Sequence, residues 1–248
     1  MRPFLFFATA VALSAAEPQR FASGPARVSL VELYTSEGCS SCPPAERWLG
    51  TMRDAPGLWR DFVPVAFHVD YWNKLGWPDK FSTKAFTQRE YDYAAAWGSG
   101  SVYTPCVVRD GAEWRARDEK ISAPRGANTG TLAASYDGAV LRAEFTPAGA
   151  PSPATTGYEI HAAILGGGIV SKVTAGENSG ETLRHEFIAL ALAQGAPGGA
   201  IALTVPKVFE LSAKASATGG VARHALAVWV TRRGDLAPLQ ATGGWLVP

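Results

Sequence analysis

Two cysteines, Cys39 and Cys42, stand where an apolar, strand-like segment has ended and a helix-like segment begins. The apolar segment spans residues 28–33, and Pro43 and Pro44 suit the first turn of a helix, where proline costs little. A thiolate at a helix N-terminus is stabilised by the helix dipole and by unpaired N–H groups, which lower the thiol pKa. A cysteine three residues further on is close enough to form a disulfide. This spacing predicts thiol–disulfide chemistry, with Cys39 as the nucleophile and Cys42 as the resolving thiol.

Other interpretations of this C-x-x-C pair remain open. One is half of a zinc site, although no second C-x-x-C or H-x-x-x-H pattern accompanies it in the sequence. Another is an inert staple, although a closed ring of four residues constrains little of the unfolded chain. A third is a non-catalytic interaction module. A carrier of copper or zinc would take its ligands from Cys39, Cys42, the third cysteine Cys106 and His68.

A second polar group follows another apolar segment, residues 62–69. His68 and Asp70 lie at its carboxyl end, which is where ligands and chemistry gather in open α/β sheets. The period of two in a strand places both side chains on one face. They could orient a partner, tune the thiolate or bind a metal, or they could form a structural hydrogen-bonded pair. We assign no role to the polar turn 177–180 or to His161, His185 and His224, which show no metal-ligand spacing.

The segments that must position these side chains form two compositional halves. In the first half the order is strand, helix, strand, helix, strand, strand, with an Asp110-Gly111 hairpin turn between the last two strands. The expected strands are 28–33, 62–69, 106–109 and 112–115, the expected helices are 43–54 and 83–97, and a closing helix within 118–130 is short or absent.

The second half is rich in short strands that are separated by glycine-rich breaks. We expect strands at 132–136, 139–145, 158–165, 169–174, 183–190, 200–205 and 222–231. Several of them alternate apolar and polar residues, as half-buried antiparallel strands do. We therefore predict an N-terminal extension over 17–27, an α/β domain over 28–130 and a β-sandwich-like domain over 131–248.

The composition bounds the class of protein. The chain has 248 residues, of which 47% are hydrophobic and 18% are charged, so wholesale disorder and polytopic membrane insertion are excluded. The 23 basic and 22 acidic residues leave a net charge of +1, so we expect no nucleic-acid partner. Three cysteines are too few for a disulfide-rich scaffold, and we expect no cofactor.

Residues 1–16 are typical of a secretory signal peptide. Arg2 gives a minimal positive region, and residues 3–13 form an apolar run that is too short to span a bilayer comfortably. Ser14-Ala15-Ala16 then supplies small residues for cleavage after Ala16. An uncleaved anchor or a buried N-terminal helix is the alternative. We expect an exported protein, periplasmic or secreted, with no membrane contact after cleavage, in a compartment where disulfides persist.

Residues 28–116 resemble the thioredoxin superfamily. The resemblance rests on the strand, the C-x-x-C, the helix and the next strand, and on Thr104-Pro105 directly before the strand-like segment 106–109. It implies that the Thr104-Pro105 bond is cis and that this dipeptide packs beside the cysteines and presents its backbone to a partner. It also implies that Glu32 is a buried carboxylate with a raised pKa that exchanges a proton with the resolving thiol, and a salt-bridged or edge-facing Glu32 is the alternative. The implied fold class is an α/β thioredoxin-like domain followed by a β-rich, sandwich-like C-terminal domain.

Longer motifs are similar to a bacterial family of exported thioredoxin-like proteins known as domain of unknown function 1223. The motifs are VELYTSEGCSSCPPAE, FHVDYWNKLGWPDKFS, GSGSVYTP and TAGENSGETLRH, and the resemblance covers nearly the whole chain after the leader. The sequence departs from the family pattern at Cys106, where glutamine usually follows the Thr-Pro pair. We therefore predict an exported thiol–disulfide oxidoreductase that acts on a thiol- or disulfide-bearing protein partner.

Overall fold

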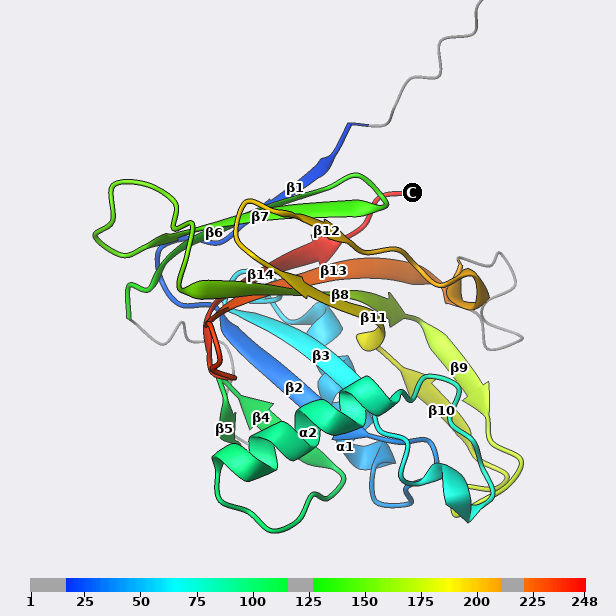
Figure 1. Ribbon diagram of the computed structural model, residues 1–248. Coiled ribbons are helices and arrows are strands. Elements are labelled where there is room, and N and C mark those ends of the chain that lie inside the picture. Colours follow the sequence, from blue (N-terminus) through cyan, green and yellow to red (C-terminus); the bar gives the residue numbers. More distant parts are fainter. Residues whose placement is uncertain (1–16, 116–126, 211–220) are drawn as a thin grey trace, which may run out of the picture.

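The computed structural model describes residues 17–115, 127–210 and 221–248. Within these ranges the chain is mostly β-structure, with three sheets, two α-helices and three short 3-10 helices (Figure 1). The 3-10 helices are η1 (Met52–Asp54), η2 (Asn73–Leu75) and η3 (Lys207–Phe209). The expected signal peptide and most of the expected segment 118–130 lie outside the described residues.

The largest sheet has eight strands in the order β14-β13-β8-β11-β3-β2-β4-β5. Their bounds are β2 (Ser29–Thr35), β3 (Phe62–His68), β4 (Cys106–Arg109), β5 (Ala112–Glu113), β8 (Tyr158–Gly167), β11 (Ile188–Gly195), β13 (Arg223–Arg232) and β14 (Pro238–Trp245). β2 and β3 are parallel, β11 joins β3 in parallel through Ile188 and Ala66, and the other neighbouring strands are antiparallel. β2 and β3 are buried along their whole length, which fits their nearly continuous apolar sequences.

This sheet overturns the expected fold class. An α/β thioredoxin-like domain followed by a β-sandwich-like domain is wrong, because the later strands β8, β11, β13 and β14 extend the same sheet that contains β2 and β3. The described chain is mostly β-structure and has only two α-helices. The local order of strands and helices from β2 to β5 is confirmed. Local patterning could not show that a strand from the second half of the chain pairs with the edge of β3.

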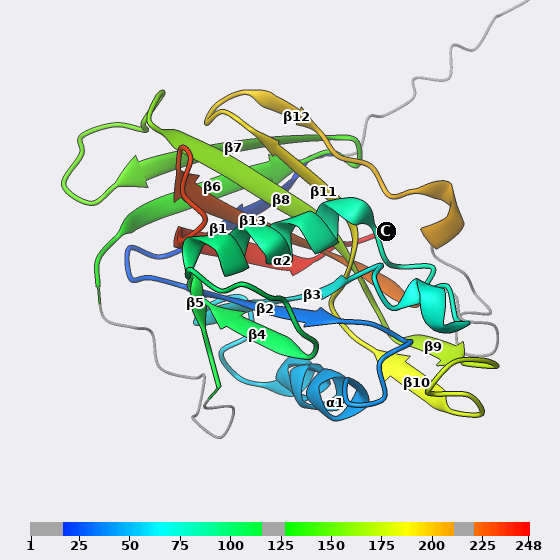
Figure 2. The same cartoon turned by 60° about the horizontal axis from the view of Figure 1, so that its bottom comes forward.

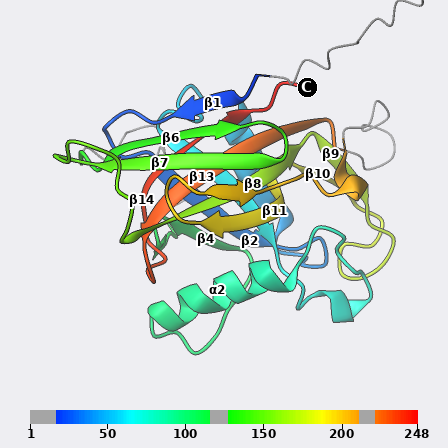
Figure 3. The ribbon, with the colours of Figure 1, turned by 45° about the horizontal axis from the view of Figure 1, so that its top comes forward.

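A second sheet packs against one face of the large sheet, over β8, β13 and β14 (Figure 3). It has the order β1-β6-β7-β12, with β1 (Gln19–Ala22), β6 (Gly130–Tyr136), β7 (Val140–Pro147) and β12 (Ala200–Ala202). Buried and exposed residues alternate along most of β6, as in a half-buried antiparallel strand. Its inward side chains, such as Leu132, pack with Phe145 of β7 and with Ile164, Leu226 and Val228 of the large sheet. β6 and β7 are confirmed, whereas β1 and β14 were not predicted.

The two α-helices lie on opposite faces of the large sheet (Figure 2). They are α1 (Pro43–Thr51) and α2 (Lys84–Ala96). Alternate side chains of β2 mark the two faces: Thr35 Oγ1 donates to Glu46 of α1, whereas Glu32 accepts from Arg89 of α2. None of the described helices is long and apolar enough to span a bilayer.

A two-stranded hairpin lies beside α1 at one end of the molecule (Figure 2). It consists of β9 (Ile169–Lys172) and β10 (Thr182–His185). The chain then bends at Phe187, which has a positive φ of 60°, before β11 begins. The single strand expected over 183–190 is therefore wrong, because its residues belong to two strands in two sheets. This break places β10 beside α1 and lets β11 pair with β3.

Candidate functional site

The two cysteines of the C-x-x-C form a disulfide between the end of β2 and the start of α1. Their Cα atoms lie 5.4 Å apart, Cys42 is the N-cap residue of α1, and its amide donates to the Cys39 carbonyl at 3.2 Å. Both cysteines are fully buried, whereas Ser40 and Ser41 between them are exposed. The disulfide therefore lies beneath a surface that the two serines form.

The first turn of α1 offers fewer hydrogen-bond donors than its sequence suggested. Pro43 and Pro44 have no amide hydrogen, and the amides of Ala45 and Glu46 donate to the Cys42 carbonyl at 2.9 and 3.1 Å. These four residues therefore supply none of the unpaired N–H groups that we expected to stabilise a thiolate. A thiolate here would therefore be stabilised by the helix dipole and by nearby side-chain hydroxyls.

The Thr104-Pro105 dipeptide precedes β4 and has a cis peptide bond. The Thr104 carbonyl oxygen lies 3.9 Å from Cys39 Sγ and accepts a hydrogen bond from Ser41 Oγ at 3.5 Å. Trp72 Nε1 donates to Thr104 Oγ1 at 2.7 Å, which fixes Thr104 against the loop after β3. The Ser41 hydroxyl is also 3.4 Å from Cys39 Sγ, so a carbonyl and a hydroxyl both stand beside this sulfur.

The tip of the β9–β10 hairpin holds the backbone around the cysteines. The buried Asn178 donates through Nδ2 to the carbonyls of Glu37 and Cys39, at 2.8 and 2.9 Å. Glu177 accepts hydrogen bonds from the amide and the hydroxyl of Ser40, at 3.1 and 2.7 Å. The loop between β2 and α1, the segment before β4 and the hairpin tip therefore meet at the disulfide.

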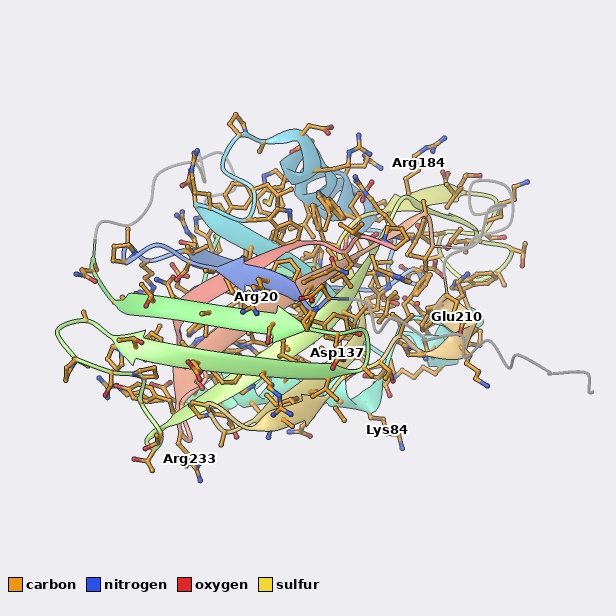
Figure 4. The ribbon with its side chains drawn as sticks, turned by 90° about the horizontal axis from the view of Figure 1, so that it is seen from above. Arg20, Lys84, Asp137, Arg184, Glu210 and Arg233 are labelled. Carbon is orange, nitrogen blue, oxygen red and sulfur yellow. A yellow bond between two sulfur atoms is a disulfide. The ribbon has the colours of Figure 1, made fainter. Side chains whose placement is uncertain are left out.

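A surface cavity of about 420 Å³ opens beside this loop. Ser40, Pro43, Arg47 and Glu177 contribute to its lining, together with Arg184 of β10. Arg184 is exposed and projects outward near α1 (Figure 4). The cavity therefore lies between the C-x-x-C loop and the β9–β10 hairpin.

Five buried titratable side chains contact one another and form a cluster: Glu37, Glu46, His68, Asp79 and His185. His185 lies between two carboxylates, because its Nδ1 contacts Glu46 Oε2 and its Nε2 is 3.2 Å from Glu37 Oε1. His68 Nδ1 is 2.6 Å from Asp79 Oδ2. The cluster joins β3, α1, β10 and the loops that follow β2 and β3.

Further hydrogen bonds fix the carboxylates of this cluster. Asp79 Oδ2 also accepts from the Glu37 amide at 2.8 Å. Trp77 Nε1 donates to Glu37 Oε2, and Thr35 Oγ1 donates to Glu46 Oε1, each at 2.7 Å. Each carboxylate thus accepts a hydrogen bond from at least one neutral donor and lies beside an imidazole nitrogen.

The charges in the cluster shift pKa values in opposite directions. Burial lowers the pKa of His185, but Glu46 and Glu37 outweigh burial and raise this pKa to about 10. Burial also opposes the charged form of His68, yet Asp79 raises the His68 pKa. For Glu46 and Asp79 burial acts upward, and the facing imidazoles bring both pKa values below their ordinary range. The carboxylates on either side of His185 therefore stabilise its protonated form.

Residues 30–231 match the family model described as protein of unknown function (DUF1223). The chain belongs to the DUF1223 family. This match confirms the resemblance to domain of unknown function 1223 that the long motifs carry. No curated protein matches the chain.

Two solved structures are similar to this DUF1223 protein. One is protein AGR_C_4864 from Agrobacterium tumefaciens, with 24% sequence identity and a TM-score of 0.58, covering 88% of this chain and 94% of that chain. The other is HBP35 of Porphyromonas gingivalis, with 12% identity and a TM-score of 0.53, covering 89% of this chain and 76% of that chain. At these identities the likeness concerns the fold alone.

Glu32 of the DUF1223 protein lies on the face of β2 that α2 covers. Its carboxylate accepts from Arg89 at 2.7 and 3.1 Å, from Tyr93 at 2.6 Å and from Tyr34 at 3.0 Å. This is the salt-bridged geometry that we had considered as the alternative. The sheet separates Glu32 from the face on which α1 packs, so we give it no proton-transfer role.

Cys106 also lies on the α2 side of the sheet. It is opposite Tyr34 in the β2–β4 pairing, and directly paired residues project from the same face. Burial raises the pKa of its thiol to about 12, and Glu90 contributes in the same direction. Within the described residues, the one cluster suited to a metal ion contains His68 but no cysteine. The structure therefore does not gather the predicted carrier ligands Cys39, Cys42, Cys106 and His68 around one point.

Asp70 does not share an environment with His68. β3 ends at His68, so the period of two does not extend to Asp70. The Asp70 carboxylate instead accepts from Thr87 of α2 at 2.6 Å. His68 lies with Glu46 and His185 on the other side.

Several polar residues of the site were not predicted from the sequence. We gave no role to His185 or to the turn that supplies Glu177 and Asn178, and we did not single out Glu37, Glu46 and Asp79. A signal was present, because all of these residues lie within three long family motifs, VELYTSEGCSSCPPAE, FHVDYWNKLGWPDKFS and TAGENSGETLRH. Spacing could not reveal them, because they come from three distant segments.

Proposed function

We propose that this protein is a thiol–disulfide oxidoreductase whose redox pair is Cys39 and Cys42. The observation that carries the proposal is the disulfide at the start of α1, beneath two exposed serines. So short a ring removes little entropy from the unfolded chain, so a stabilising role explains it poorly. The contacts of Asn178 and Thr104 further support the proposal, because they hold the backbone of Cys39 and place a carbonyl beside its sulfur.

The exchange requires only a protein partner that carries a disulfide or a dithiol. In the reducing direction, the Cys39 thiolate attacks one sulfur of a partner disulfide and forms a mixed disulfide. The other partner sulfur leaves as a thiolate and takes a proton from solvent. Cys42 then attacks Cys39 Sγ, releases the second partner sulfur as a thiolate and closes the intramolecular disulfide. Two electrons pass to the partner, and the oxidising direction is the same sequence reversed.

The neighbouring groups have separate tasks in this proposal. The Ser41 hydroxyl, now bound to the Thr104 carbonyl, is close enough to Cys39 Sγ to donate to a thiolate after the disulfide opens. Asn178 keeps the Cys39 backbone in place while its sulfur changes partners. The cavity beside Ser40 gives a partner polypeptide a place to lie next to the disulfide.

The proposal places the protein outside the cytoplasm. Residues 1–16 have the pattern of a secretory signal peptide, and exported proteins reach compartments where disulfides persist. The partner class that fits is an exported protein with an accessible disulfide or cysteine pair.

Trapping of the mixed disulfide tests this function. Cys42→Ser removes the resolving thiol, so a peptide with one disulfide should accumulate as an adduct on Cys39, detected by mass spectrometry. Cys106→Ser is the matched control, because it removes the third thiol and leaves the pair intact; we expect it to turn over like the unmodified protein. An adduct that forms equally well in Cys39→Ser would contradict the proposal.

A further inference from the structure

Two imidazole nitrogens of the buried cluster have no hydrogen-bond partner among the described residues. His68 is fully buried, its Nδ1 is bound to Asp79, and its Nε2 is unpartnered. His185 Nε2 lies 3.2 Å from Glu37 Oε1, yet these two atoms are not aligned for a hydrogen bond. Buried polar atoms normally have a partner, so the unpartnered Nε2 of His68 in particular points to a missing ligand.

Glu46 and the two histidines bring three possible ligand atoms around one point. One ligand atom from each of Glu46, His68 and His185 lies within 4.8 Å of the other two, and all three residues are buried. The rings of His68 and His185 meet edge to face, with centroids 5.5 Å apart. The three residues come from α1, β3 and β10, so the fold itself creates this arrangement.

We propose that Glu46, His68 and His185 form a binding site for a divalent cation of the zinc class. Imidazole nitrogen and carboxylate oxygen are donors that zinc takes in proteins, whereas calcium and magnesium take oxygen ligands. The local charge favours a cation. Three carboxylates face two imidazoles, so a divalent cation in place of two imidazole protons leaves the cluster at the same formal charge, −3 + 2 = −1.

The hydrogen bonds around these residues suit metal ligands. His68 places Nδ1 on the Asp79 carboxylate at 2.6 Å and leaves Nε2 free for a cation. Such carboxylate–histidine pairs orient the imidazole and raise its basicity. Glu46 is held in turn by the Thr35 hydroxyl at 2.7 Å.

The site has room to close and a path for entry. Zinc–ligand bonds of about 2.0–2.2 Å put tetrahedral ligand atoms about 3.3–3.5 Å apart, so a movement of roughly 1 Å brings the three atoms into place. Phe81 packs against both imidazoles, with ring centroids 5.5 and 5.9 Å away, and forms an apolar wall. Glu46 and His185 also help to line a surface cleft of about 590 Å³, which is the side from which a cation would enter.

The proposed site does not use the cysteines. Cys39 and Cys42 are joined in a disulfide, and Cys106 faces the opposite side of the sheet. The site shares only His68 with the carrier predicted from the sequence. Zinc binding here is therefore separate from thiol exchange, and each can fail without the other.

Zinc titration by calorimetry on the metal-stripped, disulfide-intact protein tests the site. We expect one Zn²⁺ per chain, no competition by Mg²⁺ or Ca²⁺, and at least a tenfold loss of affinity in His68→Gln and in His185→Gln. Asp79 orients His68 and is not one of the three proposed ligands, and Asp79→Asn should lower the affinity by about 10–100-fold. His224→Gln is the matched control, because the His224 imidazole contacts the Phe209 carbonyl and not the cluster.

Either of two results of the titration would overturn the proposal. One is the absence of stoichiometric zinc binding by the folded, unmodified protein, which would make the cluster a proton-bonded structural element. The other is unchanged affinity in a folded His68→Gln variant. If the histidine variants fail to fold, the absorption spectrum of Co²⁺ bound to the unmodified protein provides the test. A tetrahedral spectrum without a thiolate charge-transfer band supports the site, and a spectrum with that band contradicts it.

Discussion

At the scale of single residues, the sulfur of Cys39 lies among oxygen atoms and not among amide donors. The Thr104 carbonyl and the Ser41 hydroxyl stand beside it, while Pro43 and Pro44 carry no amide hydrogen. A carbonyl oxygen cannot stabilise a thiolate, whereas a hydroxyl can donate to it. The Ser41 hydroxyl is therefore the group whose removal should matter most for the reactivity of Cys39.

We expect Ser41→Ala to raise the Cys39 pKa in the reduced protein by about 0.5–1 unit, because a hydrogen bond to the thiolate is lost. Alkylation of Cys39 by iodoacetamide at neutral pH should then slow by about 3–10-fold. Ser40→Ala is the control, since the Ser40 hydroxyl donates to Glu177 and not to sulfur. Equal alkylation rates in the two variants would rule out this role for Ser41.

Glu90 gives the protein a predictable pH dependence of stability. Burial raises its pKa from 4.5 to about 7, although Tyr71 Oη donates to it at 3.2 Å. The folded state therefore holds this proton more tightly than the unfolded state does, so the stabilisation is complete below pH 4.5 and is lost as the pH rises through 7. We expect Glu90→Gln to remove up to about 3 kcal/mol of the stability difference between pH 5 and pH 8, measured by urea unfolding. The exposed Glu181→Gln should leave that difference unchanged, and a Glu90→Gln protein with the original pH dependence would refute the assignment.

At the scale of elements, the β9–β10 hairpin acts as a clamp on the C-x-x-C loop. It contributes Asn178 and Glu177 to the backbone around the cysteines and His185 to the buried cluster. The clamp limits how far Cys39 and Cys42 can move when their bond opens. The hairpin therefore holds the C-x-x-C loop in place and is more than a connection between β8 and β11.

We expect Asn178→Ala to speed the reduction of the disulfide by dithiothreitol several-fold and to destabilise the protein by about 1–3 kcal/mol. The reason is that the buried carbonyls of Glu37 and Cys39 lose their donor. Stopped-flow reduction and thermal unfolding measure the two effects. Ser179→Ala changes the neighbouring, exposed residue and should alter neither. A reduction rate that stays the same in Asn178→Ala would show that the hairpin does not restrain the loop.

The elements that the sequence predicted well are those decided by contiguous residues. The apolar runs of β2 and β3 and the prolines at the start of α1 fix those elements locally, and the cysteine spacing located the disulfide. The bend at Phe187 and the pairing of β11 with β3 depend on residues far apart in the chain, so local patterns did not show them. The same holds for the buried cluster, whose members His68 and His185 meet only because β10 crosses α1.

At the scale of the whole molecule, the two compositional halves share one sheet and one core. The core around β2 and β3 includes Leu165, Phe187 and Trp229, which lie in the second half of the chain. Removal of the second half would expose the edge of β3 and uncover this core. The halves are therefore coupled in folding.

We expect a fragment of residues 17–127 to remain unfolded or to aggregate, because β11, β8 and β13 no longer cover the apolar side chains of β3. A two-dimensional NMR spectrum of the fragment, compared with that of the whole chain, measures this. A dispersed, native-like spectrum of the fragment would show instead that the first half is an independent domain.

The reduction potential of the Cys39–Cys42 pair in the native protein tests the proposed function most directly. Redox buffers of dithiothreitol or glutathione set the potential, and thiols are counted by mass spectrometry after alkylation. We predict one reversible two-electron transition of about 30 mV per tenfold change, with the fold retained throughout and the same midpoint in Cys106→Ser. A disulfide that is reduced only where circular dichroism shows the protein to be unfolded would contradict the proposed function.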